Sequence, residues 1–107
     1  MEKVCFRLKL RRETLDEYVK AHESVWPEML EALSQTGWTN YSLFVDRVDS
    51  TLIGYFETPD LEQALAGMDG KEVNERWQAL MKDYFEELDG HRPDEGFHRL
   101  KSIFYLK

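Results

Sequence analysis

The chain has 107 residues, of which 42% are hydrophobic and 13% aromatic, and we expect residues 1–107 to form a single domain. Its 21 Asp and Glu residues outnumber its 14 Lys and Arg residues, and the formal net charge of -7 argues against nucleic acid or an acidic membrane surface as a partner. The chain shows neither a signal peptide nor a membrane span, and Cys5 is its only cysteine, so we expect a cytoplasmic protein without an intrachain disulfide.

An alternating strand and an interrupted helix come first. Residues 4–10 alternate between apolar and polar side chains, which predicts a strand with one buried face. The capping-box pair Thr14 and Glu17 predicts that a helix begins directly afterwards. Pro27 has no N–H and restricts the residue before it, so we expect the helix to kink or restart there and to end at Gly37.

Two further strands follow as a predicted hairpin. Residues 41–45 and 52–57 carry strand patterns, and the polar residues 46–50 between them predict a turn. Both faces of these strands carry apolar or aromatic side chains, yet one chain has helices for only one face. We therefore expect a second copy to cover the other face in a symmetric homodimer.

The second half of the chain completes a recognisable order of elements. The pattern predicts a short helix over residues 60–68, a longer helix over 73–88, a loop over 89–96 and a closing strand over 100–106. The order is strand, helix, two strands, helices and strand. It predicts an α+β protein with the ferredoxin-like βαββαβ arrangement.

Three histidines are the candidates for acid–base chemistry near neutral pH. His91 in the polar loop and His98 at the start of the last strand need no functional explanation. His22 lies four residues after Tyr18 and four before Trp26, which places the phenol and the imidazole on one helical face. The structural alternative is a histidine on an apolar stripe that hydrogen-bonds to a backbone carbonyl.

The remaining patterns favour chemistry without a cofactor or a metal ion. The sequence has no helical His-x-x-x-His pair, glycine-rich phosphate loop, nucleophile elbow or dinucleotide fingerprint. Aromatic residues at positions 18, 38, 41 and 77 are candidates for a pocket lining, although Trp77 at helical spacing is core by default. The residues alone do not choose between a pocket and a core.

The sequence resembles the L-rhamnose mutarotase family, which are small sugar epimerases on a dimeric ferredoxin-like α/β-barrel. The resemblance covers nearly the whole chain, and the run H-x-x-x-W-P-E is its most specific part in combination with the N-Y and R-W pairs. The residues that carry it are Tyr18, His22, Val25-Trp26-Pro27-Glu28, Gly37, Asn40-Tyr41, Asp46, Arg76-Trp77 and Phe104-Tyr105-Leu106.

The resemblance implies a mutarotase that interconverts the α and β anomers of L-rhamnose without a cofactor. It implies that His22 is the proton donor and that Tyr18, Tyr41 and Trp77 contact the sugar. One position departs from the pattern, because Gln78 stands where some members have a second tryptophan. The second proton-transfer group stays open among a water, a tyrosine and a carboxylate.

Two alternative functions remain at this stage. One is a cofactor-free monooxygenase or related enzyme on the same dimeric fold, since a fold does not determine a function. The other is a binding or dimerisation module in which the aromatic residues are only core. The proline inside the run H-x-x-x-W-P-E argues against the second alternative, because a purely packed helix gains nothing from it.

Overall fold

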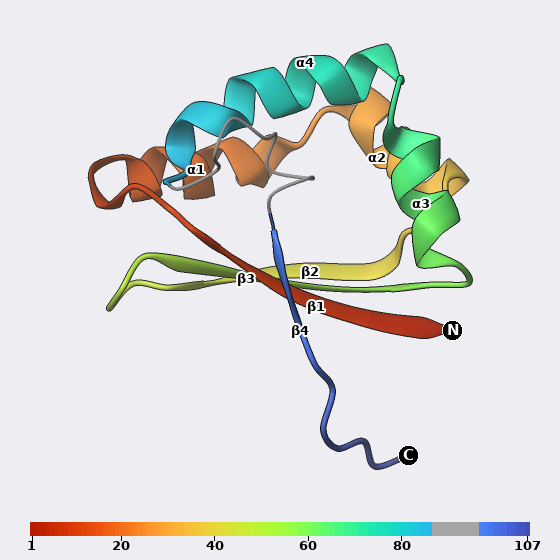
Figure 1. Cartoon of the computed structure of the whole chain (residues 1–107). Helices are drawn as coiled ribbons and strands as arrows, with labels where there is room; N and C mark the ends of the chain where they lie inside the picture. The colour runs from red at the N-terminus through yellow and green to blue at the C-terminus, as the bar shows by residue number, and fades with distance from the viewer. Residues whose placement is uncertain (87–96) are drawn as a thin grey trace.

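The computed structural model describes residues 1–86 and 97–107, which form a sheet with helices on one of its faces (Figure 1). The strands are β1 (Glu2–Lys9), β2 (Thr39–Asp46), β3 (Thr51–Thr58) and β4 (His98–Leu100). The α-helices are α1 (Leu15–Ala21), α2 (Pro27–Gln35), α3 (Leu61–Met68) and α4 (Glu72–Met81). Short 3₁₀ turns are η1 (Arg12–Thr14), η2 (His22–Ser24) and η3 (Lys82–Tyr84).

The sheet confirms the predicted ferredoxin-like arrangement. Its strand order is β2-β3-β1-β4, and every neighbouring pair is antiparallel. β1 therefore lies inside the sheet, between β3 and the closing strand, although it is first in the chain. This order requires the two crossovers that carry α1 with α2 and α3 with α4, and Figure 1 shows all four helices above the same sheet face.

The main core lies between the sheet and the helices. Alternate residues of β1 and β3 point toward the helices and are buried, as period-two patterning requires. Val4 and Phe56 are fully buried there, and Leu52 is 2% exposed. Helices contribute Leu15, Met29, Ala32, Ala64, Met68, Trp77 and Met81 to the same cluster. The predicted buried face of the first strand is thus confirmed.

The interruption before Pro27 is confirmed, and its form is a restart. Val25 and Trp26 have extended backbone angles, with ψ values of 139° and 133°. Those are the angles that a proline imposes on the residue before it. Pro27 is then the first residue of α2, where a missing N–H removes no intrahelical bond.

The helix ends agree with the sequence in part. Gly37 has a positive φ of 93°, as predicted for a left-handed cap, and Asp60 caps α3 by accepting a hydrogen bond from the Gln63 N–H at 3.1 Å. The capping box is wrong, because the Thr14 side chain caps no helical N–H and instead reaches the Arg11 carbonyl at 3.5 Å. The 3₁₀ turn η1 ends at Thr14 and leads directly into α1, so Thr14 is already part of a turn where the helix begins.

The helix predicted over residues 73–88 is shorter in the structure, where it is α4. α4 ends at Met81, and after η3 the chain becomes extended at Phe85, which forms an isolated antiparallel bridge with Leu10. Pairing with the chain after β1 therefore ends the helical pattern early. Leu80 lies one residue before the buried Met81 on α4 and is itself 51% exposed. Residue 88, the predicted end of this helix, and the predicted loop over 89–96 with His91 lie outside the described residues.

The closing strand also differs from its prediction. β4 pairs with residues 5–7 of β1 and ends at Leu100, whereas the alternating pattern predicted a strand over residues 100–106. The pairing with β1 stops where Leu100 lies opposite Cys5, so alternation alone does not make the following residues a strand. Their large side chains are exposed, from 64% at Tyr105 to 91% at Ile103. No helix among the described residues is long and apolar enough to cross a membrane.

Candidate active site

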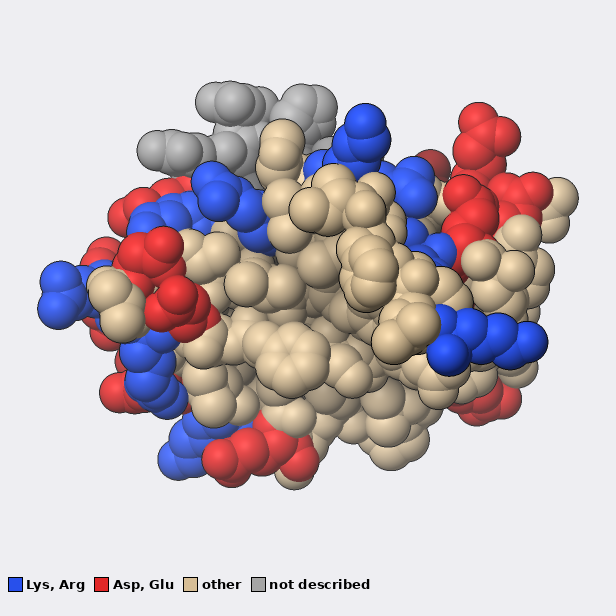
Figure 2. Space-filling model, turned by 90° about the horizontal axis from the view of Figure 1, so that it is seen from below, with Lys and Arg blue, Asp and Glu red and all other residues tan. Residues whose placement is uncertain are grey.

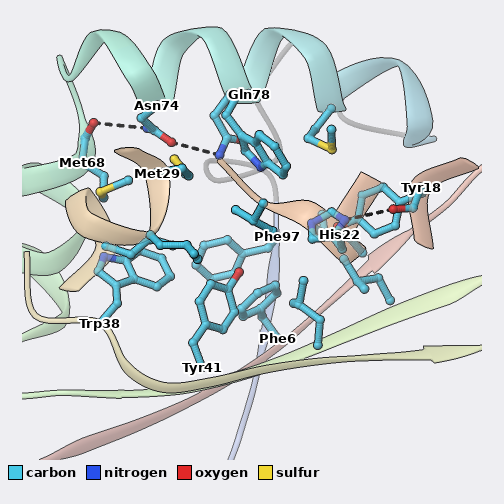
Figure 3. Close-up of a pocket in the computed structure, with 18 of the residues that line it drawn as sticks. Phe6, Tyr18, His22, Met29, Trp38, Tyr41, Met68, Asn74, Gln78 and Phe97 are labelled. Atoms are coloured by element: carbon cyan, nitrogen blue, oxygen red, sulfur yellow. Dashed lines mark hydrogen bonds between the residues drawn. The ribbon is translucent and has the colours of Figure 1, made fainter. Parts of the chain in front are cut away.

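A cavity of about 390 Å³ lies between the sheet and the helices (Figure 3). Pockets for small molecules typically have volumes of roughly 300–1,000 Å³, so this cavity is large enough for a monosaccharide. Its described lining is mostly apolar and comes from β1, β2, β3, all four helical segments and Phe97. The lining side chains with a hydroxyl, an imidazole or a carboxamide are Tyr18, His22, Tyr41, Asn74 and Gln78.

The structure brings the four sequence-predicted site residues together. Tyr18 comes from α1, His22 from η2, Tyr41 from β2 and Trp77 from α4, and all four line the cavity. Four segments that are distant in the sequence thus contribute to one cavity. His98, the weaker candidate, lies exposed on β4 and is not part of the lining.

His22 is positioned by the end of α1. The backbone N–H of His22 donates to the carbonyls of Val19 and Lys20, and its ring Nδ1 lies 3.0 Å from the carbonyl oxygen of Tyr18. A carbonyl oxygen only accepts hydrogen bonds, so Nδ1 carries the hydrogen. Nε2 then carries the lone pair in the neutral ring and is the nitrogen that can exchange a proton with a ligand in the cavity.

Burial favours the neutral form of this imidazole. Desolvation lowers the pKa of His22 below its ordinary value of 6.5, and the hydrogen bond to the Tyr18 carbonyl opposes that shift in part. At neutral pH the ring is therefore a base at Nε2. The backbone bond that the structural alternative required is present, but it occupies only one of the two nitrogens.

Tyr18 packs directly against the imidazole. The two ring centroids are 4.4 Å apart, which confirms that the i, i+4 spacing places them on one face. The phenol is 5% exposed, and its burial, together with the nearby Tyr41, raises its pKa above the ordinary value. Tyr18 therefore stays protonated, so its hydroxyl can donate a hydrogen bond but does not serve as a base.

A β-bulge turns Tyr41 toward the cavity. In the register with β3, Thr39 pairs with Glu57 and Ser42 with Tyr55, so two residues of β2 oppose one residue of β3. Asn40 within the bulge has a positive φ of 48°, a conformation that asparagine tolerates better than most residues. Without the bulge, Tyr41 and Thr39 would share the opposite face, because alternate strand residues point the same way.

Trp77 forms a wall beside the imidazole. Its ring meets that of His22 edge to face, with centroids 5.4 Å apart and an interplanar angle of 84°. On another side Trp26 packs against it at 5.0 Å. Trp77 is 7% exposed, so it is a core residue and a lining residue at once.

The sequence patterns missed one polar pair in the lining, Asn74 and Gln78 on α4. Gln78 Nε2 donates to Asn74 Oδ1 at 3.1 Å, and Asn74 Nδ2 donates to the Met68 carbonyl at 3.2 Å. Asn74 is 1% exposed and Gln78 is 8% exposed. The signal was available, because two carboxamides at i and i+4 share the apolar face that carries Trp77 and Met81.

Among residues 1–86 and 97–107, no group of three or more His, Cys, Asp or Glu side chains is arranged to hold a metal ion. The cavity presents one imidazole, two phenols, two carboxamides and indole rings. These groups can donate and accept hydrogen bonds, move one proton and pack against C–H surfaces.

Comparison with known proteins identifies the family. The model of the L-rhamnose mutarotase family matches residues 3–106. An L-rhamnose mutarotase from Lachnoclostridium phytofermentans is 32% identical over 106 residues, which cover 99% of each chain. One from Listeria monocytogenes is 33% identical over 106 residues, again 99% of each chain.

Solved structures give the same result for the fold. The crystal structure of an L-rhamnose mutarotase from Formosa agariphila superposes with a TM-score of 0.80 at 26% identity, covering both chains completely. An antibiotic biosynthesis monooxygenase superposes with a TM-score of 0.63 at 16% identity, covering 96% of this chain and 99% of the other, and this likeness shows the fold alone. The chain belongs to the L-rhamnose mutarotase family.

Proposed function

We propose that this chain interconverts the α and β anomers of L-rhamnose, or of a closely related aldose, in the cavity beside His22. The family supports the reaction. The observation that carries the role of His22 is its ring geometry: Nδ1 is held by the Tyr18 carbonyl, and the ring lines a cavity of sugar size. The alternatives of a monooxygenase and a binding module gain no support from the residues of the cavity.

The proton balance of the reaction needs one group that both accepts and donates. Neutral His22 accepts the anomeric hydroxyl proton at Nε2, and the resulting imidazolium returns a proton to the ring oxygen. The bond between C1 and the ring oxygen breaks, the open aldehyde turns about C1–C2, and the ring closes on the other face. The Nδ1–H bond to the Tyr18 carbonyl favours the transient positive charge. C1 carries both the anomeric hydroxyl and the ring oxygen, so the two sites of proton transfer are close together. A water molecule can therefore relay one of the two transfers.

The other predicted residues bind and orient the sugar in this proposal. The Tyr18 phenol, kept protonated by burial, donates a hydrogen bond to a sugar oxygen near the imidazole. Tyr41, turned inward by the bulge, hydrogen-bonds a second hydroxyl from the sheet side. Trp77 offers an aromatic surface to the C–H side of the ring and fixes the angle of the imidazole.

The test is an NMR exchange measurement of the two anomers of L-rhamnose with wild-type protein, His22→Ala and His98→Ala. We expect exchange far above the buffer rate for wild type and His98→Ala, because His98 is exposed and outside the cavity lining. His22→Ala should lose about 10²–10⁴-fold, the range that a positioned general acid–base group contributes. Full activity in His22→Ala would exclude the assigned role, and no acceleration by wild type with any related aldose would exclude the function.

We also propose that the chain works as a symmetric homodimer whose sheets pack face to face. The register places a set of side chains on the sheet face opposite the helices, because residues directly paired across strands share a face. These are Cys5, Phe44, Ile53, Tyr55 and Leu100. Phe44 is 61% exposed, and Figure 2 shows uncharged residues at the centre of this face with charged residues around it.

The tail after β4 supports the same proposal. Ile103, Phe104 and Leu106 are each at least 80% exposed, and the tail runs on the side of the sheet away from the helices (Figure 1). The Lys3 ammonium lies over the Tyr105 ring, 2.6 Å from its centroid, which holds part of the tail against β1. A second copy would give these residues the apolar and strand partners that one chain lacks.

Sedimentation equilibrium tests the dimer. We expect wild type to sediment at twice the chain mass of 12.7 kDa, and Phe44→Lys to sediment as a monomer or a much weaker dimer. Val48→Lys is the matched control, because Val48 is 90% exposed in the turn beyond the strands. A monomeric wild type, or a Phe44→Lys variant that dimerises like wild type, would contradict this arrangement.

Two broader expectations remain proposals. We propose that residues 1–107 act as one domain, since the family match spans residues 3–106. We also propose the cytoplasm as the site of action, since a free, half-buried Cys5 fits a reducing compartment. Cell fractionation with an antibody against the chain tests the second proposal, and recovery in a secreted or membrane fraction would contradict it.

A further inference from the structure

We propose that Glu57 on β3 is a positioning residue for Tyr41: its carboxylate holds the Asn40 amide on the outer face of the sheet, and this bond keeps the Tyr41 ring turned into the cavity. The outer face is the sheet face opposite the helices. The proposal rests on the proposed function, because it concerns how the phenol that binds the sugar is held in place. Glu57 itself does not line the cavity.

The bulge in β2 adopts a backbone conformation that needs support. It sets two residues, Asn40 and Tyr41, opposite the single residue Phe56 of β3. Asn40 has a positive φ of 48°. Asparagine tolerates this conformation better than most residues, but it is still less favourable than the ordinary strand region. The surroundings of the bulge therefore have to hold it in place.

Three hydrogen bonds fix Glu57 against the bulge. Its Oε1 accepts from Asn40 Nδ2 at 2.9 Å, and its backbone carbonyl accepts from Thr39 Oγ1 at 2.9 Å. Its Oε2 accepts from the Tyr55 hydroxyl at 2.7 Å. Each carboxylate oxygen thus has its own donor, so the carboxylate cannot turn away from Asn40 without also losing the Tyr55 hydroxyl.

The carboxylate of Glu57 is ionised at neutral pH. Hydrogen bonds from the Tyr55 hydroxyl and, second, from the Asn40 amide lower the pKa of Glu57 below its ordinary value of 4.5. Lys3, which pairs with Glu57 in the register of β1 and β3, acts in the same direction. A hydrogen bond to an ionised acceptor is stronger than one to a neutral acceptor. The Asn40 amide is therefore held by a charge-assisted bond.

Tyr41 depends on its backbone for its position more than its aromatic neighbours do. It is 38% exposed, whereas Trp38 is 8% exposed and Phe56 is fully buried. Its ring packs against these two rings, with centroids 5.3 and 5.6 Å away, and another side of it lines the cavity (Figure 3). Successive strand residues point to opposite faces, so the Asn40 amide outside and the Tyr41 ring inside share one backbone conformation. Loss of the amide bond frees the ring as well.

The experiment is a double-mutant cycle between Glu57→Ala and Tyr41→Phe. KM and kcat for anomer exchange of L-rhamnose are measured by NMR for wild type, each single variant and the double variant. Glu57→Gln is added because its amide oxygen can still accept from Asn40. Glu31→Ala is the matched control, because Glu31 is a surface carboxylate outside the cavity lining that accepts from the Gln35 carboxamide at 3.1 Å.

We expect Glu57→Ala and Tyr41→Phe each to raise KM about 10-fold with little change in kcat, as for the loss of one hydrogen bond to the sugar. The double variant should have the KM of Tyr41→Phe alone, because Glu57 acts through the phenol hydroxyl. A merely structural role would instead add its effect to that of Tyr41→Phe. Glu57→Gln should recover most of the wild-type KM, and Glu31→Ala should retain it.

Asn40→Gly tests the same bond from its other end. Glycine adopts a positive φ without steric cost, so the bulge stays accessible while the amide donor is lost. KM should rise as in Glu57→Ala, and the two substitutions together should have the effect of one. This variant keeps the proposal testable where Glu57→Ala fails to fold.

Several outcomes would overturn the proposal. A wild-type KM in Glu57→Ala, or additive effects in the cycle, would show that Glu57 does not act through Tyr41. A wild-type KM in Tyr41→Phe would leave no hydroxyl contact to position. A loss in Glu57→Ala that disappears at protein concentrations where sedimentation shows a dimer would assign the effect to the subunit contact instead.

The wild-type protein separates these failures from a failure of the function. In each of the outcomes above, exchange of L-rhamnose by wild type leaves the proposed function standing. Absence of exchange by wild type with any related aldose overturns the function and this proposal together.

Discussion

Gly54 on β3 provides a test of how closely the sheet supports the cavity. It pairs with Phe6 of β1 in the register, and the Phe6 ring lies over it. A Cβ at position 54 would lie 2.2 Å from Cζ of Phe6 and 2.6 and 2.7 Å from its two Cε atoms. Gly54→Ala therefore places a methyl group where the ring now stands, and Phe6 has to move.

The required movement can be worked out from these distances. Ordinary contact begins at 3.4 Å, so the ring must withdraw by 3.4 − 2.2 = 1.2 Å. Phe6 packs against Phe97 at 4.6 Å and against Phe56 at 6.3 Å, and it also lines the cavity. Forcing extra volume into a packed core costs roughly 1–3 kcal/mol. The melting temperature should fall by about 4–8 °C for each kcal/mol in a domain of about 100 residues.

Urea denaturation and anomer exchange measure the two consequences. Gly54→Ala should unfold at a lower urea concentration and exchange L-rhamnose more slowly, because the displaced ring alters the cavity wall. Phe6→Leu removes part of the obstructing ring, so the double variant should lose less stability than the sum of the two single variants. A Gly54→Ala variant with wild-type stability and activity, or strict additivity in the double variant, would refute the reasoning.

Three further predictions concern single groups. Because burial lowers the pKa of His22 below 6.5, kcat/KM should stay level at neutral pH and fall as acid protonates Nε2 at a midpoint below 6.5; a pH–rate profile with a higher midpoint would contradict this. Asp60→Ala removes the cap on the Gln63 N–H and should lower the free energy of unfolding by about 0.5–2 kcal/mol in urea. Trp38→Phe removes the bond from Nε1 to the Ala64 carbonyl and should cost about 1 kcal/mol by the same measurement, so an equally stable variant would argue against that bond.

The order of elements was predictable because it depends on local patterns. Alternation in residues 4–10 reflects a strand with one face on the core, and a polar turn between two strands leaves a hairpin as the short connection. Pro27 limits its own φ and its neighbour's angles whatever the tertiary structure. The i, i+4 contact of Tyr18 and His22 likewise needs only one turn of helix.

Features that depend on distant partners were not predictable in the same way. Alternation continues through residues 100–106, but a strand also needs hydrogen-bonded pairing, and the pairing of β4 with β1 ends at Leu100. Regular alternation would put Thr39 and Tyr41 on one face, and only the pairing with β3 reveals the bulge between them. Asn40 in the N-Y pair is a local indication of that bulge, because asparagine tolerates the positive φ that this residue adopts there.

The interrupted helix connects the sequence pattern to the chemistry of the site. In a continuous α-helix the N–H of His22 would donate to the carbonyl of Tyr18, four residues earlier. In this chain α1 ends at Ala21 and the 3₁₀ turn η2 follows, so the N–H of His22 donates to Val19 and Lys20 instead. The Tyr18 carbonyl then receives Nδ1–H of the imidazole, and this bond places the lone pair on Nε2. The end of α1 at Ala21 therefore leaves the Tyr18 carbonyl to the imidazole that we propose as the proton-transfer group.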